Sequence, residues 1–230
     1  MEKGVVFTYS KSSQGTQKKH AERKYVMKYE SEVKKLLITN AIHLIAKGGF
    51  EMATTKELTH CNGNLPNVKM NEVYIYRLFG SKEHLFEAAF VELDEELHDA
   101  FWRGYNSIEG DMFENTKDKC LQFFDMAWRF IMKDEERCRC YIRYLYSIYF
   151  KGKSLETHKT LFAPIIEALS PLFKEEADVP AIIHSVFMMM FDFAIRVYNG
   201  DIVDDDINRP HIFNVLYCMM MTYFNEFATT

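Results

Sequence analysis

The chain has 230 residues, a formal net charge of −5 at pH 7, 48% hydrophobic residues and 15% aromatic residues. This composition is sufficient for a sizeable core and excludes an intrinsically disordered chain. Residues 1–90 contain 14 basic and 9 acidic residues, whereas residues 91–230 contain 14 basic and 24 acidic ones. The asymmetry favours a nucleic-acid-binding part on an acidic body, and the alternative is chance variation along the surface.

Residues 1–30 form a polar, basic N-terminal extension without the apolar core of a signal peptide. In front of a DNA-binding domain, such an arm lies along phosphates or enters a minor groove. A solvated leader is an equal alternative. The basic residues on which this depends are Lys11, Lys18, Lys19, Arg23, Lys24 and Lys28.

A helix is predicted from about Ser31 to Lys47, because apolar residues recur on one face at helical spacing. After it, Thr54 stands in the position of an N-cap, with Glu57 at the spacing of a capping box. The short helix that begins there is predicted to end near Asn62-Gly63.

A second short helix is predicted from Asn71, which can cap it, to Gly80, which can end it. Two short capped helices joined by a turn are the sequence pattern of a helix-turn-helix. Ser81 can cap a longer helix whose apolar periodicity continues to about Tyr105. That helix is long enough to run from residues 31–90 into residues 91–230.

Helical periodicity continues to the end of the chain, and no alternating pattern typical of strands occurs. We therefore predict an all-α fold of about nine helices, with a three-helix domain at 31–90 and a larger helical domain at 91–230. The later helices are indicated by apolar positions at Cys120–Ile131, Cys138–Tyr149 with an end at Gly152, Leu161–Phe173 with a kink or new start at Pro164, Asp178–Gly200 and Asn208–Phe227.

The stretch from about Val33 to Phe90 resembles the DNA-binding domain of the tetracycline-repressor (TetR-like) transcriptional regulators. The rest of the chain agrees with that family only in length and helical character. The resemblance implies a helix-turn-helix domain followed by an effector-binding and dimerisation domain. The motifs that carry it are Gly48-Gly49-Phe50, Thr54-Thr55, Ile75-Tyr76-Arg77-Leu78-Phe79, Ser81-Lys82-Glu83 and Leu85-Phe86.

Two features differ from the family pattern. Six additional residues, Asn64 to Lys69, lengthen the turn, and Val73 stands where the family has glycine. A longer turn changes how the recognition helix is presented, and a β-branched residue holds its backbone further from DNA. Both favour the alternative of a TetR-like protein that binds a protein partner instead of DNA.

The helix from Asn71 to Phe79 is expected to be the recognition helix in the major groove. Its exposed face is predicted to consist of Glu72, Val73, Tyr74 and Arg77. By their positions in the family pattern, further residues are implied to hold the DNA backbone: Thr55, Lys56, Tyr76 and Lys82. Three alternatives without a role in DNA binding remain open. Tyr76 packs in the core, Lys82 is solvated, or Glu72 is a favourable charge at the start of the helix.

The resemblance also implies a pocket for a small effector in the second domain. Methionine and aromatic side chains there favour an apolar or aromatic ligand, although each residue is individually more typical of core or surface. The predicted lining is Phe124, Trp128, Tyr144, Tyr149 and Met189, with Arg143 or His184 as polar anchors.

The last two predicted helices have apolar residues on more than one face. One face fills the core, and a partner subunit would cover the other, as the family's homodimer implies. The alternative is that one chain buries both faces. The predicted interface residues are Met190, Phe191, Tyr217, Met220 and Phe224.

No phosphate-binding loop, nucleophile elbow or paired zinc motif occurs, and we expect neither an enzyme nor a cofactor. Only one Glu-x-x-His unit is present, Glu95 to His98, where a di-metal site needs two. The odd cysteine count and the apolar surroundings of Cys138 and Cys140 favour buried thiols. Because polar residues interrupt residues 181–197, we expect no membrane span and a cytoplasmic protein.

These patterns together predict a ligand-responsive transcriptional regulator, in the first place a repressor. It is expected to bind a double-stranded, two-fold-symmetric DNA operator as a homodimer and to respond to a small apolar or aromatic effector.

Overall fold

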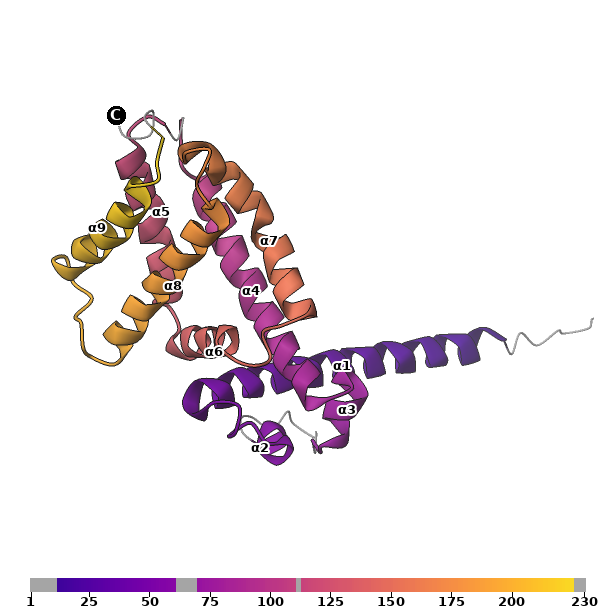
Figure 1. The fold of residues 1–230 in the computed structure, drawn as a ribbon. Helices are drawn as coiled ribbons and strands as arrows, with labels where there is room; N and C mark the ends of the chain where they lie inside the picture. Colours follow the sequence, from indigo (N-terminus) through magenta and orange to yellow (C-terminus); the bar gives the residue numbers. More distant parts are fainter. Residues whose placement is uncertain (1–11, 61–69, 111–112, 226–230) are drawn as a thin grey trace, which may run out of the picture.

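The computed structural model describes residues 12–60, 70–110 and 113–225, and the elements in these ranges confirm the predicted all-α fold. Nine α-helices and a short 3-10 helix occur in these residues (Figure 1). The helices are α1 (Ser12–Gly48), α2 (Thr55–His60), α3 (Val73–Phe79), α4 (Lys82–Asn106), α5 (Thr116–Ile131), α6 (Glu135–Leu145), α7 (Lys153–Leu169), η1 (Ser170–Leu172), α8 (Val179–Tyr198) and α9 (Asn208–Met221). The lengthened turn, Asn64 to Lys69, lies outside the described residues.

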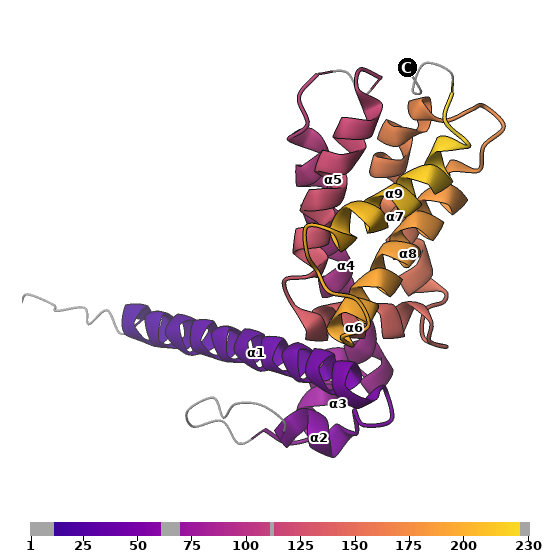
Figure 2. The same cartoon turned by 90° about the vertical axis from the view of Figure 1, so that its left-hand side faces the viewer.

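Helix α1 is longer than predicted, because it begins at Ser12 rather than Ser31. The added segment contains four lysines and no proline, so that no proline prevents the helix from continuing. In both views its N-terminal half extends beyond the other helices (Figures 1 and 2). The basic extension is therefore continuous with the first helix of the small domain from Ser12 onward.

Helices α1, α2 and α3 form the small domain with the start of α4. Leu58 of α2 and Ile75 of α3 are fully buried against α1. The buried Asn40 of α1 donates a hydrogen bond from Nδ2 to the carbonyl oxygen of Leu58 at 2.8 Å. This hydrogen bond holds α2 against α1. Helix α3 is held against α1 by the burial of Ile75.

The predicted helix caps agree with the structure. Thr54 Oγ1 accepts a hydrogen bond from the amide of Glu57 at 3.2 Å, and Ser81 Oγ accepts one from the amide of His84 at 3.1 Å. Asn71 Oδ1 accepts a hydrogen bond from the amide of Val73 at the start of α3. At the end of α3, Gly80 has a φ of +84°, which favours glycine. These local signals position the two short helices.

Helix α4 runs unbroken from the small domain into the larger one, as predicted. It packs against α1 and α3 near its start and against α5, α6 and α7 further along (Figures 1 and 2). Its buried side includes Leu85, Phe90 and Phe101, which belong to one continuous core. The predicted domain boundary at residue 90 thus falls inside a single helix.

Helix α6 lies between the body and α1 (Figure 1). It ends at Leu145, earlier than the predicted end near Gly152, because Ser147 Oγ and the following turn take over the hydrogen bonding. Helix α7 continues through Pro164. Helix α9 ends at Met221 rather than at Phe227, which lies outside the described residues.

Helix α8 is the one helix in the described ranges that is long and apolar enough to cross a membrane by length and composition. That test is weak evidence, because core helices of soluble proteins also satisfy it. Here α8 packs against α5, α6, α7 and α9, and its polar residues His184, Ser185, Asp192 and Arg196 are exposed. These contacts are typical of a core helix.

Candidate nucleic-acid interface and ligand cavity

The outward side of α3 is exposed. Val73 and Tyr76 keep 66% and 55% of their surface accessible, and Asn71 and Glu72 are also exposed. Thr55, at the start of α2, donates a hydrogen bond from Oγ1 to the Glu72 carboxylate at 2.7 Å. The N-terminal ends of α2 and α3 are therefore held together by a polar contact on the exposed side of the small domain.

Tyr74 and Arg77 are more constrained than predicted. Tyr74 is half-buried, and its hydroxyl lies 3.2 Å from that of Tyr29 on α1. Arg77 places its guanidinium 4.7 Å from the centroid of the Tyr74 ring and pairs with Glu30 at 3.2 Å. The packing tyrosine of the small domain is therefore Tyr74, while Tyr76 is free of the core.

The two predicted phosphate-binding lysines differ in their surroundings. Lys56 is exposed on α2, one residue after Thr55. Lys82 is half-buried at the start of α4, and its Nζ lies 5.5 Å from the centroid of the Phe86 ring. The aromatic ring thus restrains the ammonium group of Lys82, whereas Lys56 has no such contact among the described residues.

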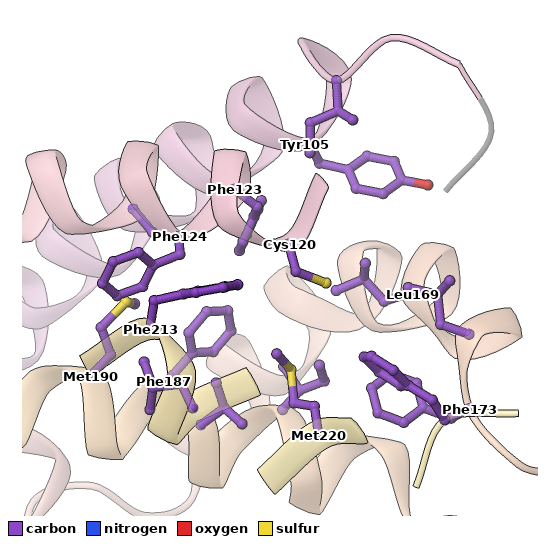
Figure 3. Close-up of a pocket in the computed structure, with 17 residues that line it drawn as sticks. Tyr105, Cys120, Phe123, Phe124, Leu169, Phe173, Phe187, Met190, Phe213 and Met220 are labelled. Carbon is purple, nitrogen blue, oxygen red and sulfur yellow. The ribbon is translucent and has the colours of Figure 1, made fainter. Parts of the chain in front are cut away.

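The body of the molecule contains a cavity of about 60 Å³, which we call the apolar cavity (Figure 3). Its lining comes from α4, α5, α7, η1, α8 and α9 and is made of apolar side chains, Cys120 and the edge of Tyr105. Tyr105 donates its hydroxyl to the Ala168 carbonyl oxygen at 3.5 Å, so this polar group is already used. Such a lining selects hydrocarbon over polar ligands.

Most of the predicted pocket residues lie elsewhere. Phe124 lines the apolar cavity, and His184 lines a second cavity beside it. Trp128 is buried and donates Nε1–H to Asp204 Oδ1 at 3.1 Å, and Met189 packs on the core outside both cavities. The placement of these last two as lining residues was wrong, because it depended on which face of α5 and α8 turns inward.

Arg143, Tyr144 and Tyr149 were also predicted in the pocket, but they lie at the junction between the small domain and the body. Arg143 donates Nη1–H to the Ile45 carbonyl oxygen at 2.8 Å, next to the end of α1. The ring of Tyr144 stacks on Phe90 at 4.3 Å, and that of Tyr149 lies 4.7 Å from Phe50. These three residues therefore join α6 and the following turn to α1 and α4.

An ion pair adds to this junction. His43 Nδ1 of α1 lies 2.8 Å from Glu136 Oε1 of α6. Gly49, which ends α1 with a φ of +80°, brings its backbone close to the Arg143 guanidinium. Sequence patterns had assigned the Gly48-Gly49 pair only to a helix end, and its second role depends on a contact across the fold.

The predicted dimer residues are not available on the surface of this chain. Met190, Phe191, Tyr217 and Phe224 are buried within it, and Met220 is half-buried. Met190, Met220 and Phe224 line the apolar cavity instead (Figure 3). Four of these five side chains are therefore buried within a single chain, and only Met220 is partly accessible to a partner.

Other apolar side chains of the same two helices do reach the surface. Val215 and Met221 keep 45% and 43% of their surface accessible, and Tyr223 beyond α9 keeps 48%. Beside them, Ala181, Ile182 and Met219 line an open groove of about 480 Å³ between α8 and α9. The sequence correctly indicated apolar residues on two faces, but periodicity alone did not separate the inner face from the outer one.

The cysteine prediction is confirmed for Cys138 and Cys140, which are buried. Burial raises the pKa of each of these thiols to about 12, and that of Cys120 to about 12 as well. No group of three or more potential metal ligands occurs among the residues that the structure describes. His98, the end of the single Glu-x-x-His unit, pairs with the neighbouring Asp99 at 3.3 Å.

No protein-family model matches the sequence, and no curated protein matches it either. Solved structures do match the fold. A TetR-family transcription regulator from Marinobacter aquaeolei VT8 superposes with a TM-score of 0.69 at 13% identity, over 87% of this chain and 100% of that one. The chain has the TetR-family fold.

Further structures support this assignment of fold. A putative TetR-family regulator from Shewanella sp. PV-4 gives a TM-score of 0.66 at 15% identity, over 84% of this chain and 99% of that one. One from Vibrio parahaemolyticus gives 0.57 at 17% identity, with coverage of 84% and 99%. The TetR-like fold thus extends well beyond residues 33–90, to which the sequence resemblance was confined.

Proposed function

We propose that the chain is a transcription regulator that binds DNA through α2 and α3 as a homodimer and responds to a small apolar effector. The observation that carries this proposal is the exposed outer side of α3, held beside the N-terminus of α2, on a TetR-like fold. Repression by the free protein and release by the effector are the simplest mode of action for this arrangement.

In the proposed complex, α3 enters the major groove. Val73, Tyr76 and Glu72 are on its exposed side and face base edges or sugars. Lys56 and the N-terminal amides of α2 face phosphates, which attract positive charge and amide donors but carry no sequence information. Arg77 must leave Glu30 to reach a base, because the two side chains form an ion pair in the free protein.

The response to an effector is proposed to pass through α4 and α6. Helix α4 begins in the small domain and lines the apolar cavity with Tyr105 near its end, and α6 contacts α1 through Arg143. Because the cavity is small, a ligand of ordinary size separates the helices around it. A coupling of roughly 1–3 kcal/mol would change operator affinity by about five- to 150-fold.

The homodimer is proposed to form through the outer faces of α8 and α9. Val215, Met221 and Tyr223 leave an apolar surface beside the groove between these helices. A second copy that covers this surface would remove it from water. It would also present two α3 helices to a two-fold-symmetric site, as helix-turn-helix dimers do.

The test is selection of bound fragments from a genomic library by the purified chain at several salt concentrations. The expected result is a two-fold-symmetric sequence whose affinity falls steeply with salt. Lys56→Ala is expected to weaken all DNA sequences alike and to reduce the salt slope by about 0.9 per subunit, or about 1.8 for the dimer, whereas Tyr76→Ala should weaken the selected sequence more than random DNA. Lys159→Ala is the control, because Lys159 is an exposed cation on α7.

Failure to enrich any sequence at low salt, with and without ligand, would exclude DNA reading. One observation favours the alternative of a protein partner: the two most exposed side chains of α3, Val73 and Tyr76, are apolar or aromatic. In that case the same two residues would be required for capture of the partner, and binding would persist at high salt because apolar contacts do not depend on counterion release.

A further inference from the structure

A second cavity of about 50 Å³ lies beside the apolar cavity. The two have two wall residues in common, Ile183 and Phe187, both on α8. We call the second one the histidine cavity, because His158 and His184 contribute ring nitrogens to a lining that is otherwise largely aliphatic and aromatic. Rotation of the Phe187 side chain would join the two cavities into one elongated site.

His158 is oriented by a buried carboxylate. Its Nδ1 lies 2.9 Å and 3.1 Å from the two oxygens of Asp94, which is 1% exposed. Tyr141 donates its hydroxyl to the same carboxylate at 2.8 Å. Because an ionised carboxylate only accepts hydrogen bonds, Nδ1 carries the proton, and the Nε2 of His158 remains for another group. No hydrogen bond to Nε2 occurs among the described residues.

His184 provides a second ring at the solvent side. It lines the histidine cavity but is itself exposed, so the cavity reaches water beside it. Burial lowers the pKa of His184, and the neighbouring His158 lowers it further, so the ring is neutral near pH 7 and has one N–H to donate. The histidine cavity is therefore the polar end of the joined site, and the apolar cavity is its hydrocarbon end.

We propose that the effector is a single-chain carboxylic acid whose carboxylate binds between His158 and His184 and whose hydrocarbon tail passes Phe187 into the apolar cavity. The head group is a carboxylate because His184 offers a ring N–H donor there, and because His158, whose Nδ1–H is already bonded to Asp94, offers a second N–H from Nε2 when a bound anion favours its protonated form. The tail is unbranched because it must pass from one small cavity to the next. This ligand assignment rests on the proposed function, since it names what the regulator senses.

The site also connects the ligand to the DNA-binding part. The head group lies one ring away from Asp94, and Asp94 belongs to α4, which continues into the small domain. A carboxylate that draws His158 toward itself acts on the Asp94 contact. The tail acts on the same helix through Phe187, whose ring stacks on Phe101 of α4 at 4.6 Å.

The experiment is titration calorimetry of the full chain with hexanoic, octanoic, decanoic and dodecanoic acids, and with the alcohol of each length. Affinity is expected to rise about fourfold for each added methylene until the site is full. Each acid is expected to bind at least tenfold more tightly than its alcohol, because hydrogen bonds to a charged group are the stronger ones. Equal binding of acid and alcohol, or no binding of either series, would overturn the assignment.

Two variants test the two ends of the ligand site independently. His184→Phe should abolish the preference for acid over alcohol, whereas Cys120→Phe, which fills the apolar cavity, should weaken both ligands. His211→Phe is the matched control, because His211 is exposed on α9 and lines neither cavity. If His184→Phe does not fold, His184→Leu serves the same purpose, because leucine also has no hydrogen-bond donor. A preserved acid preference in the folded variant, or unchanged affinities in Cys120→Phe, would contradict the proposed pose.

The same protein preparations separate this assignment from the proposed function. Acid binding without enrichment of any DNA sequence would leave the ligand assignment intact and exclude the DNA-binding regulator. Enrichment of an operator without acid binding would have the opposite meaning. If both occur, decanoic acid should change operator affinity in the wild-type chain and His211→Phe, but not in Cys120→Phe.

Discussion

Arg143 joins the body to the small domain through a single well-defined hydrogen bond, from Nη1 to the carbonyl oxygen of Ile45. Arg143→Met keeps most of the side-chain length but removes this donor and leaves a half-buried carbonyl without it. We expect a loss of about 1–3 kcal/mol in the free energy of unfolding, measured by urea denaturation. Arg129→Met is the control, because Arg129 is exposed and bonds only within its own helix. Equal effects of the two variants would show that the junction contributes nothing.

The buried thiols are expected to be chemically inert. With a pKa of about 12, a thiol at pH 8 is ionised in about one molecule in ten thousand, and the thiolate is the reactive form. In a Cys61→Ser background, iodoacetamide should modify the exposed Cys218 quickly and the other three cysteines only after unfolding. The check is mass spectrometry of tryptic peptides over time. Rapid modification of Cys138 in the folded chain would contradict its burial.

Residue identity alone was a good guide where a residue acts on its immediate neighbours. Thr54 and Ser81 bond amides three residues away, so their pattern contained the whole interaction. The sequence did not show which of Tyr74 and Tyr76 is packed and which is exposed, because both are aromatic residues of one short helix. Only the position of Tyr29 on α1 decides which of them is packed.

At the level of whole elements, the sequence predicted the helices but not which sides face each other. The start of α1 was missed because polar helix-forming residues show no apolar periodicity. Phe124 lines the apolar cavity, whereas Arg143 and Tyr149 lie at the junction with the small domain, because α6 turns toward α1 rather than toward the cavity. Where two faces of a helix are equally apolar, only the packing of the helices against each other determines which face is buried.

Helix α7 contains a proline in its interior, which offers a test at the same scale. Pro164 has no amide hydrogen, so the carbonyl of Thr160 receives no bond from it, and the ring crowds the preceding turn. Pro164→Ala is expected to raise the free energy of unfolding by about 1–3 kcal/mol, because the side chain is exposed and alanine completes the helix. The measurement is the midpoint of urea unfolding followed by circular dichroism.

Pro171→Ala is the matched control for this substitution. Pro171 lies in the first turn of η1, where an amide hydrogen has no intrahelical acceptor, so its replacement should change stability by less than about 0.5 kcal/mol. A similar gain in both variants would show that the gain in Pro164→Ala does not come from completing the interior of α7. A loss in Pro164→Ala would mean that the proline bends α7 into a shape that the core requires.

At the scale of the whole molecule, the proposed dimer can be tested by placing a carboxylate on the outer face of α8 and α9. Met221→Glu introduces a charge into the apolar surface of α8 and α9, and we expect it to shift the chain from dimer to monomer in sedimentation experiments. Ile148→Glu is the control, since Ile148 is 76% exposed in the turn between α6 and α7. A monomeric wild-type chain, or an unchanged dimer in Met221→Glu, would exclude this interface.

The unbroken course of α4 has a consequence for building chimeric sensors from this protein. A chimera that joins the small domain of another protein to this body at residue 90 would cut inside α4. It would also separate Phe90 from its stacking partner Tyr144 on α6. The new small domain would also have to accept the guanidinium of Arg143 at the end of its own first helix. The exchangeable unit is therefore the small domain together with α6. Under the proposed function, designs that exchange the small domain alone should bind DNA but lose their response to the effector.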